Sequence, residues 1–374
     1  FEIMAIPFFI LAGNFLTHGG VARRMINFAA SMVGHWYGGL GLGGVLACAL
    51  FAAVSGSSPA TVVAIGSILL PAMVKAGFPR SFGAGVITTS GALGILIPPS
   101  IVMVMYSVAT NTSVGALFMA GVVPGIALAG VLAGVTWYRA KKYNYPRLPK
   151  ATWAERLVAF RASAWGLLLI VIVMGGIYTG MFTPTEAAAM SAVYAFIVAV
   201  FVYKDMGLKD VPRVLLNSAN MSAMLLYIIT NAVLFSFIMT NENIPQALAD
   251  WMLGNGLGMI TFLLAVNVIL LLAGNFMEPS SIVLIFAPIL FPVAMKLGID
   301  PVHFGIIMVV NMEVGMCHPP VGLNLYVASG ITKMGITELT VAVWPWLLSM
   351  LGFLAVVTYW PGLSLWFPRW LGMI

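Results

Sequence analysis

Most of this 374-residue sequence consists of apolar runs of membrane-spanning length, separated by short polar segments. A spanning helix needs about 20 consecutive apolar residues. Hydrophobic residues make up 61% of the chain and charged residues only 7%, which is too little polar surface for a water-soluble domain. We therefore expect an all-α polytopic membrane protein in a lipid bilayer. The net charge is +6, and the basic residues lie between the apolar runs. They therefore indicate membrane topology and not a nucleic-acid partner.

Several of the apolar runs are interrupted by helix breakers at mid-length. Two pairs of apolar arms meet at short polar tips, and we expect re-entrant hairpins at 38–75 and 259–296. A helix can be interrupted at membrane depth only where protein groups or a water-filled cavity form hydrogen bonds with the freed peptide groups. Two further runs contain Pro-Pro, which removes helix hydrogen-bond donors, so we expect broken helices at 82–110 and 302–331.

The breakers recur at a fixed spacing. A gapless shift of 221 positions places Pro71 on Pro292, Gly94 on Gly315, and Pro98-Pro99 on Pro319-Pro320. We therefore predict two structural repeats. The predicted division is an N-terminally truncated scaffold segment (1–36), the first repeat (37–138, ending in a helix at 114–138), a cytoplasmic basic linker (139–162), scaffold helices (163–240), an interfacial amphipathic segment (241–258), the second repeat (259–360, ending in a helix at 339–359) and a C-terminal tail (361–374).

The basic residues indicate that the two repeats are inverted. If the linker at 139–162 is cytoplasmic, the two hairpins enter from opposite sides of the membrane. Of the 17 basic residues, only Lys296 and Arg369 then lie outside the cytoplasmic set. Inverted repeats with broken helices near the midplane are typical of secondary transporters.

The tips and breaks are the candidate binding sites. Freed carbonyl and hydroxyl oxygens suit a desolvated Na⁺, and half-helix N-termini suit a carboxylate. At any single break, a kink filled by a neighbouring helix is the alternative. Among the acidic residues, Glu278 on the second tip is a site candidate. Glu186 is explained equally well by helix capping. Glu313 is open to a role in the site or in orienting the second break. His318 is open to a structural or a proton-coupling role.

Motifs of common membrane-associated enzymes are absent from the sequence. It contains no Gly-Lys dipeptide of a phosphate-binding loop and no His-Glu-x-x-His metal motif. We therefore expect a transporter and not an enzyme. A membrane scaffold or an intramembrane enzyme is the hypothesis of a different class, and it predicts no uptake.

Four motifs carry a family resemblance. They are Ser-Gly-Ser-Ser-Pro-Ala at 55–60, Thr-Thr-Ser-Gly-Ala-Leu-Gly-Ile-Leu-Ile-Pro-Pro-Ser at 88–100, Phe-Thr-Pro-Thr-Glu-Ala-Ala at 182–188 and Glu-Pro-Ser-Ser at 278–281. With them the whole chain resembles the large membrane subunit of tripartite ATP-independent periplasmic (TRAP) transporters, of the DctM type. Cys317-His318 stands where the family pattern leads us to expect a small hydroxyl residue such as Thr.

This resemblance implies a Na⁺-coupled elevator transporter in the bacterial inner membrane, with two or more Na⁺ ions. It implies uptake of C4-dicarboxylates such as succinate, malate or fumarate, with a DctQ-type small membrane subunit and a DctP-type periplasmic substrate-binding protein. The alternatives are a TRAP subunit for another carboxylate, such as a sugar acid or sialic acid, and a stand-alone ion-coupled organic anion transporter.

The resemblance also implies the site residues. The first Na⁺ site is expected at Ser55, Gly56, Ser57, Ser58, Gly94 and Pro98. The second is expected at Met277, Glu278, Ser280, Ser281, Gly315 and Pro319. The expected substrate ligands between them are Thr89, Ser90, Pro99, Ser100, Asn311, His318, Pro320 and Asn324.

Overall fold

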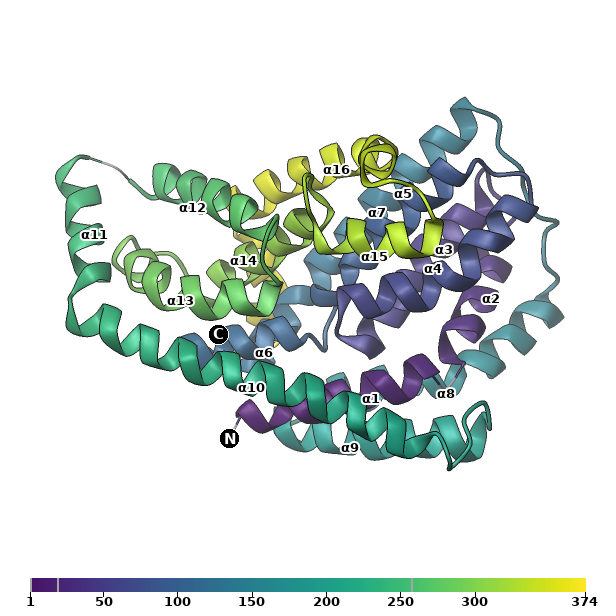
Figure 1. Cartoon of the computed structure of the whole chain (residues 1–374), viewed down its shortest axis with the longest axis horizontal. Coiled ribbons are helices and arrows are strands. Elements are labelled where there is room, and N and C mark those ends of the chain that lie inside the picture. The colour runs from purple at the N-terminus through teal and green to yellow at the C-terminus, as the bar shows by residue number, and fades with distance from the viewer. Residues whose placement is uncertain (1, 19, 257) are drawn as a thin grey trace.

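The chain folds into packed helices (Figure 1), in a computed structural model that describes residues 2–18, 20–256 and 258–374. No strand occurs among these residues. Seven helices are long and apolar enough to cross a membrane, and the bent pair α1 and α2 would be an eighth span if counted as one. The prediction of an all-α polytopic membrane protein is therefore confirmed.

The first part of the chain contains the first hairpin and the first broken helix. Its elements are η1 (Glu2–Met4), α1 (Ala5–His18), α2 (Val21–Val33), α3 (Gly39–Ser55), α4 (Ser58–Lys75), α5 (Arg80–Gly91), η2 (Ala92–Ile95), α6 (Ile101–Thr110) and α7 (Val114–Lys142). The middle of the chain contains α8 (Trp153–Tyr178), α9 (Pro184–Ile197), the π-helical turn η3 (Val198–Val202) and α10 (Val211–Asn241).

The last part of the chain contains the second hairpin and the second broken helix. Its elements are α11 (Ile244–Gly254), α12 (Met259–Gly274), α13 (Pro279–Lys296), α14 (Pro301–Cys317), α15 (Leu323–Thr332), α16 (Ile336–Tyr359) and α17 (Gly362–Trp370). Both breaks lie at the predicted Pro-Pro pairs, and the Pro98–Pro99 and Pro319–Pro320 peptide bonds are cis.

The helices of the two halves recur at the spacing of the breakers. α4 begins at Ser58 and α13 at Pro279, while α5 begins at Arg80 and α14 at Pro301, so both pairs are 221 residues apart. The packing is also reciprocal, because α4 contacts α15 and α13 contacts α6. In the same way α5 contacts α16 and α14 contacts α7. Each half therefore packs part of its hairpin and broken helix against the other half.

Two segments are more helical than the sequence predicts. α7 continues to Lys142 and α8 begins at Trp153, so the irregular part of the 139–162 linker is only 143–152. α8 begins there because Thr152 and Glu155 form a capping box. The segment expected as a tail at 361–374 contains α17, which packs against α7.

A second capping box, between Thr183 and Glu186, begins α9, so Glu186 caps a helix.

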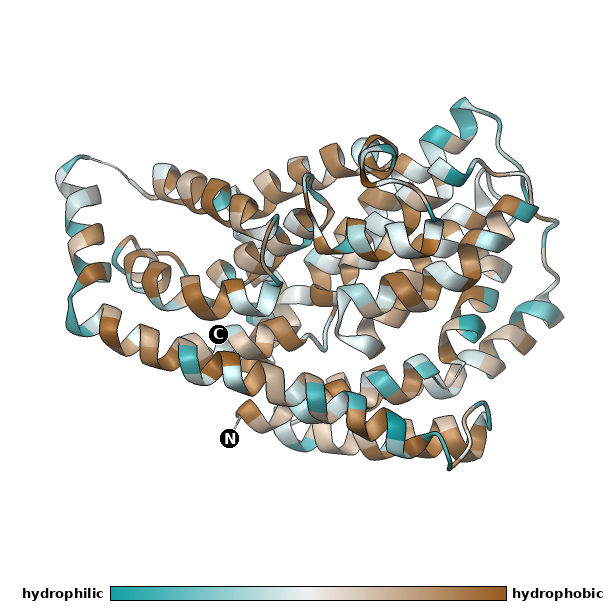
Figure 2. Cartoon of the chain, viewed as in Figure 1, coloured by the Kyte–Doolittle hydropathy of each residue, from teal (hydrophilic) through white to brown (hydrophobic). Residues whose placement is uncertain are grey.

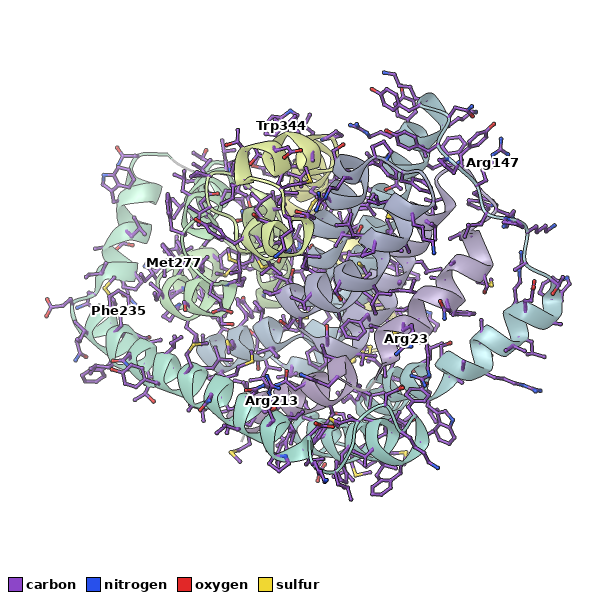
Figure 3. All side chains as sticks on the ribbon, turned by 45° about the vertical axis from the view of Figure 1, so that its right-hand side comes forward. Arg23, Arg147, Arg213, Phe235, Met277 and Trp344 are labelled. Carbon is purple, nitrogen blue, oxygen red and sulfur yellow. The ribbon has the colours of Figure 1, made fainter. Side chains whose placement is uncertain are left out.

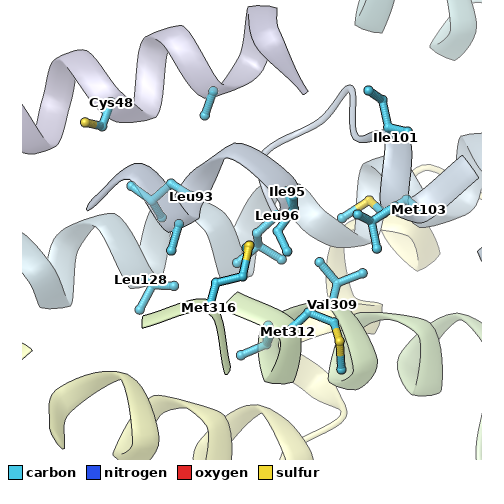
Figure 4. Packing of buried hydrophobic residues seen from close by; sticks show 14 of the residues in the cluster. Cys48, Leu93, Ile95, Leu96, Ile101, Met103, Leu128, Val309, Met312 and Met316 are labelled. Carbon is cyan, nitrogen blue, oxygen red and sulfur yellow. The ribbon is translucent and has the colours of Figure 1, made fainter. Parts of the chain in front are cut away.

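The buried centre contrasts with an apolar outer layer. Every residue of α14 from Val302 to Cys317 is buried, as expected for a helix that is apolar on all sides. Its methionines Met312 and Met316 lie against Leu96 and its neighbours at the first break (Figure 4). By contrast, α8 and α10 consist largely of apolar residues (Figure 2), and many of these are exposed, such as Val171 at 65%. In a membrane protein such a surface faces lipid or another subunit.

The outer helices form a group of their own. α1 packs against α9 and α10, and α8 packs against α2 and α9. α10 runs along the lower edge of the bundle in Figure 1, and α11 connects it to α12 at the left. The hairpins and broken helices therefore lie together on one side of this group.

We expect Trp346→Ala to lower the free energy of unfolding by about 3–5 kcal/mol, because it leaves a large cavity. The Trp346 ring is fully buried, lies 5.7 Å from the Phe82 ring, and its indole N–H donates to Thr136 Oγ1 at 2.9 Å. Thermal unfolding in detergent can be followed with a thiol-reactive dye, since both cysteines are buried and free. Trp344→Ala is the matched control, because Trp344 is 46% exposed. Equal melting temperatures for the two variants would contradict this packing.

Candidate functional site

The first hairpin tip lies against the first break. Gly56 ends α3 with a positive φ of 61°, a conformation that favours glycine, and α4 begins two residues later. A Cβ on Gly56 would lie 2.9 Å from the Pro99 carbonyl oxygen. A Cβ on Gly94 would lie 2.6 Å from the Ser57 carbonyl oxygen. The two glycines therefore allow the tip and the break to meet backbone to backbone.

Hydroxyl groups close this first tip. The Ser55 and Thr61 hydroxyl oxygens are 2.9 Å apart, and the Thr61 hydroxyl donates to the Ser57 carbonyl at 2.9 Å. The Ser58 hydroxyl donates to the Gly91 carbonyl at 3.0 Å. The expected residues 55–58 thus form one oxygen-rich cluster with the end of α5. The sequence analysis missed Thr61, although a hydroxyl one turn after the tip was a usable signal.

The second hairpin tip is organised by a carboxylate. Glu278 caps α13, because its two oxygens accept from the Ser280 hydroxyl at 2.7 Å and from the Ser281 backbone N–H at 3.3 Å. An acid at a helix N-terminus also interacts favourably with the helix dipole. Just before this tip, Gly274 lies against Gly315, and a Cβ on either would be 3.0 Å from the other's Cα.

Asn275 connects the second tip to the second break. Its side chain lies 3.0 Å from His318 Nδ1. With its amide nitrogen turned toward the break, Asn275 donates to the His318 carbonyl at 2.9 Å and to the Pro319 carbonyl at 3.0 Å. The sequence places Asn275 on the tip, but its partners could not be known without the fold. His318 is thus hydrogen-bonded at the position expected for it.

The second break also reaches the first tip. The Asn324 amide donates to the Ser58 hydroxyl at 2.7 Å and to the Thr88 carbonyl at 3.4 Å. The Cys317 thiol donates to the same Thr88 carbonyl at 3.4 Å. The segment 318–324 therefore runs from the second tip to the first and contacts both.

Buried oxygens without a hydrogen-bond partner occur one turn before the breaks. In the described part of the chain they include Ser90 Oγ, Asn311 Oδ1 and both carboxylate oxygens of Glu313. Ser90 precedes Gly94 by four residues, as Asn311 precedes Gly315. Buried oxygens normally have a hydrogen-bond partner, so these oxygens are free to bind a cation or a hydrogen-bond donor. The residues present therefore fit an alkali cation.

Several expected site residues have other local contacts. Thr89 donates to the Gly85 carbonyl within α5, and Ser100 caps α6 and donates to the Ile95 carbonyl. Pro98 lines a mostly apolar cavity of about 480 Å³ that also contacts α17, and Pro320 is exposed. These four residues are not joined to a tip by any hydrogen bond in the described part of the chain.

Asn311 lies away from both tips. Its amide donates to the carbonyl and side-chain oxygens of Asn267 at 3.0 and 2.9 Å, and Asn267 donates to the Thr358 hydroxyl at 2.9 Å. The sequence analysis missed Asn267, whose signal was a lone amide in an otherwise apolar arm. This pair joins α12 to α14 two turns before the tip.

A cavity of about 440 Å³ separates the second tip from α10. The tip contributes Met277 and Ser281, while α10 contributes Tyr227, Asn231 and Phe235. Figure 3 shows Met277 and Phe235 on facing elements. The second tip therefore borders open space on the side of the outer helices, whereas Ser55 and Ser58 at the first tip are buried.

The packed hairpins and broken helices define a helical membrane transporter fold. A solved structure of the Alcanivorax borkumensis YdaH transporter matches it with a TM-score of 0.66, covering 96% of this chain and 86% of that one. The sequence identity is 15%, so this likeness concerns the fold alone.

Residues 1–363 match the family described as "Tripartite ATP-independent periplasmic transporter, DctM component", and the chain belongs to this family. It is 76% identical to the C4-dicarboxylate TRAP transporter large permease protein DctM of Rhodobacter capsulatus, over all of this chain and 88% of that protein. It is 57% identical to the protein of the same name from Pseudomonas aeruginosa, over all of this chain and 87% of that protein. The predicted family is confirmed, and the chain is a multi-pass permease subunit of the inner membrane.

We expect Gly94→Ala to lower the free energy of unfolding by about 1–3 kcal/mol, because the added methyl group would force the first tip off the break. Gly134→Ala is the control, since a Cβ there meets no heavy atom within 4 Å and α7 should gain helix propensity. The thiol-dye melting assay compares the two variants. A Gly94→Ala protein as stable as Gly134→Ala would mean that the tip and the break are not in close contact.

Proposed function

We propose that this chain carries C4-dicarboxylates such as succinate, malate and fumarate across the inner membrane by Na⁺ symport. The observation that carries the proposal is the 76% identity, along the whole chain, to a relative named as a C4-dicarboxylate large permease. A second relative with the same name is 57% identical. At these identities the residues around both tips and breaks are expected to serve the same class of substrate.

The proposed ion sites lie where each tip meets its break. At the first, the Ser55 and Ser58 hydroxyl groups and the Ser57 carbonyl would provide oxygen ligands next to Gly94. At the second, Glu278 and the carbonyls around Gly315 would do so. Na⁺ prefers hard oxygen ligands, and the Ser90 hydroxyl and the Glu313 carboxylate supply buried oxygens that have no hydrogen-bond partner in the described part of the chain. One bound cation at each place would also reduce the electrostatic repulsion between an incoming dianion and acidic groups such as Glu278.

The proposed substrate site lies along the segment 318–324. Two helix N-termini meet at its Asn324 end, because α15 begins at Leu323 and α4 begins at Ser58. At its other end lie His318 and the N-terminus of α13. Helix N-termini favour anions, so a carboxylate of the substrate fits the Asn324 end, whereas at the His318 end a bound cation would have to offset the Glu278 carboxylate that caps α13.

The proposed transport motion is an elevator movement of the hairpins and broken helices against the outer helices. The contacts between the tips and segment 318–324 would keep the moving part together. The cavity between the second tip and α10 would give it space. α11 connects the two parts, and its Asp250 pairs with Lys296 at the end of α13. We propose that the two repeats are inverted across the membrane, as the distribution of basic residues indicates.

The proposed partners are a small DctQ-type membrane subunit and a DctP-type periplasmic substrate-binding protein. The family description names a tripartite transporter of which this chain is one component. The outward apolar faces of α8 and α10 provide surface for lipid and for a second membrane subunit. The binding protein would deliver the carboxylate, while this chain would provide the transport step.

We expect uptake of labelled succinate into proteoliposomes only when the chain, its small subunit, the cognate binding protein and an inward Na⁺ gradient are all present. The measurement compares a Na⁺ gradient with an equal K⁺ gradient, and tests sialic acid and a sugar acid as competing substrates. Na⁺-dependent uptake without binding protein would favour a stand-alone carrier. Uptake of sialic acid but not succinate would contradict the substrate assignment. A folded complex that moves no organic acid would contradict the function itself.

A further inference from the structure

A strongly basic surface lies outside the transport site, on the connection between α7 and α8. We define the linker cations as Lys141, Lys142, Arg147, Lys150 and Arg156, of which the first four are exposed. None of the five forms an ion pair in the described part of the chain. This surface serves neither the tips nor the breaks.

Acidic side chains do not balance these charges. The one acid between 139 and 161 is Glu155. Its carboxylate is already used at the start of α8, where it accepts from the Thr152 backbone N–H at 2.6 Å and from the Thr152 hydroxyl at 3.0 Å. The linker cations therefore have no carboxylate partner of their own among the described residues.

The connection is fixed to the body of the protein. The Leu148 backbone N–H donates to the Gly34 carbonyl at 2.9 Å, and the Tyr145 ring lies 4.7 Å from the Phe82 ring. Figure 3 shows Arg147 at the outer rim of the molecule. The chain around the cations is thus held in place, and four of the five cations are exposed on it.

Aromatic and apolar side chains alternate with the cations. Lys141 Nζ lies 5.0 Å from the centroid of the Trp137 ring, and the Arg156 guanidinium lies 5.3 Å from that of Trp153. Trp153 is 82% exposed, and the next turn of α8 also exposes Val158. Exposed tryptophan and aliphatic groups between cations are typical of a membrane interface and not of a solvated face.

Arg156 has donors that lack acceptors. Its Nε and Nη2 atoms are buried and have no hydrogen-bond partner in the described part of the chain. Two such donors on one guanidinium match two oxygens of a phosphate group. Arg139 has a different environment, because it lies over Trp346 and shares a cavity with Glu338, so we exclude it from the surface.

We propose that the linker cations bind the headgroups of anionic phospholipids in the leaflet at this end of the molecule. Clusters of four to eight basic residues beside a spanning helix are suited to anionic lipid. The bound headgroups fix the depth of the outer helices, against which the transport part moves. The proposal does not depend on which carboxylate is carried.

The test is retention of phosphatidylglycerol by the purified full chain. The chain is reconstituted in a mixture of phosphatidylethanolamine and phosphatidylglycerol, extracted, and weighed with its bound lipid by native mass spectrometry. We compare the linker variant Lys141→Gln, Lys142→Gln, Arg147→Gln, Lys150→Gln, Arg156→Gln with the control variant Lys75→Gln, Arg80→Gln, Lys204→Gln, Lys209→Gln, Arg213→Gln. Both variants remove five charges, and the thiol-dye assay shows whether each is folded.

We expect the linker variant to bind phosphatidylglycerol more weakly by about fivefold for each charge that contacts a headgroup, while the control variant binds like the unchanged protein. Equal losses in both variants would overturn the proposal in favour of a general charge effect. Full retention by the linker variant would overturn it directly. Loss of bound lipid when the small membrane subunit is added would overturn the proposal, because a protein partner would then cover this surface.

Discussion

The structure depends on how broken backbone is satisfied at membrane depth. Each hairpin tip and each Pro-Pro break frees peptide groups that lipid cannot hydrogen-bond. Here side chains satisfy part of this need, because the Ser58 hydroxyl donates to the Gly91 carbonyl and the Asn324 amide donates to the Thr88 carbonyl. Glycine allows the backbones to approach closely at Gly94 against Ser57 and at Gly274 against Gly315. The same close approach concentrates oxygen atoms and helix N-termini at two places in an apolar bundle. The site that we propose for a cation and a carboxylate would thus follow from the way the fold packs its broken helices.

Much of this arrangement could be predicted from the sequence, because breakers in long apolar runs leave few alternatives. The positions of Pro98-Pro99 and Pro319-Pro320 predicted where both helices are interrupted. The spacing of 221 residues also recurs, because α13 and α14 begin 221 residues after α4 and α5. The start of α8 could not be placed by apolar character alone, because a capping box extends it ten residues into the basic linker. α17 was missed because a short helix after Pro361 has a pattern that also fits a tail.

The candidate site was predictable residue by residue only at the tips. Hydrogen bonds such as Asn324 to Ser58 join residues 266 positions apart, so no local pattern contains them. They place the second break between the two tips, where His318, Pro320 and Asn324 are expected as substrate ligands. Asn311 bonds Asn267 and not a tip, because α12 and α14 pack side by side before the break. Helix order follows from composition and breakers, whereas these partners follow from tertiary packing.

We propose that a cation binds where each tip meets its break, and Asn324 holds the second break against the first tip at Ser58. The most direct test is the melting temperature of the purified chain in Na⁺ and in choline at equal ionic strength, since a ligand that binds the folded state stabilises it. We expect a higher melting temperature in Na⁺ for the unchanged protein and a smaller difference for Asn324→Ala. Equal melting temperatures in the two salts, or an undiminished Na⁺ effect in Asn324→Ala, would contradict it.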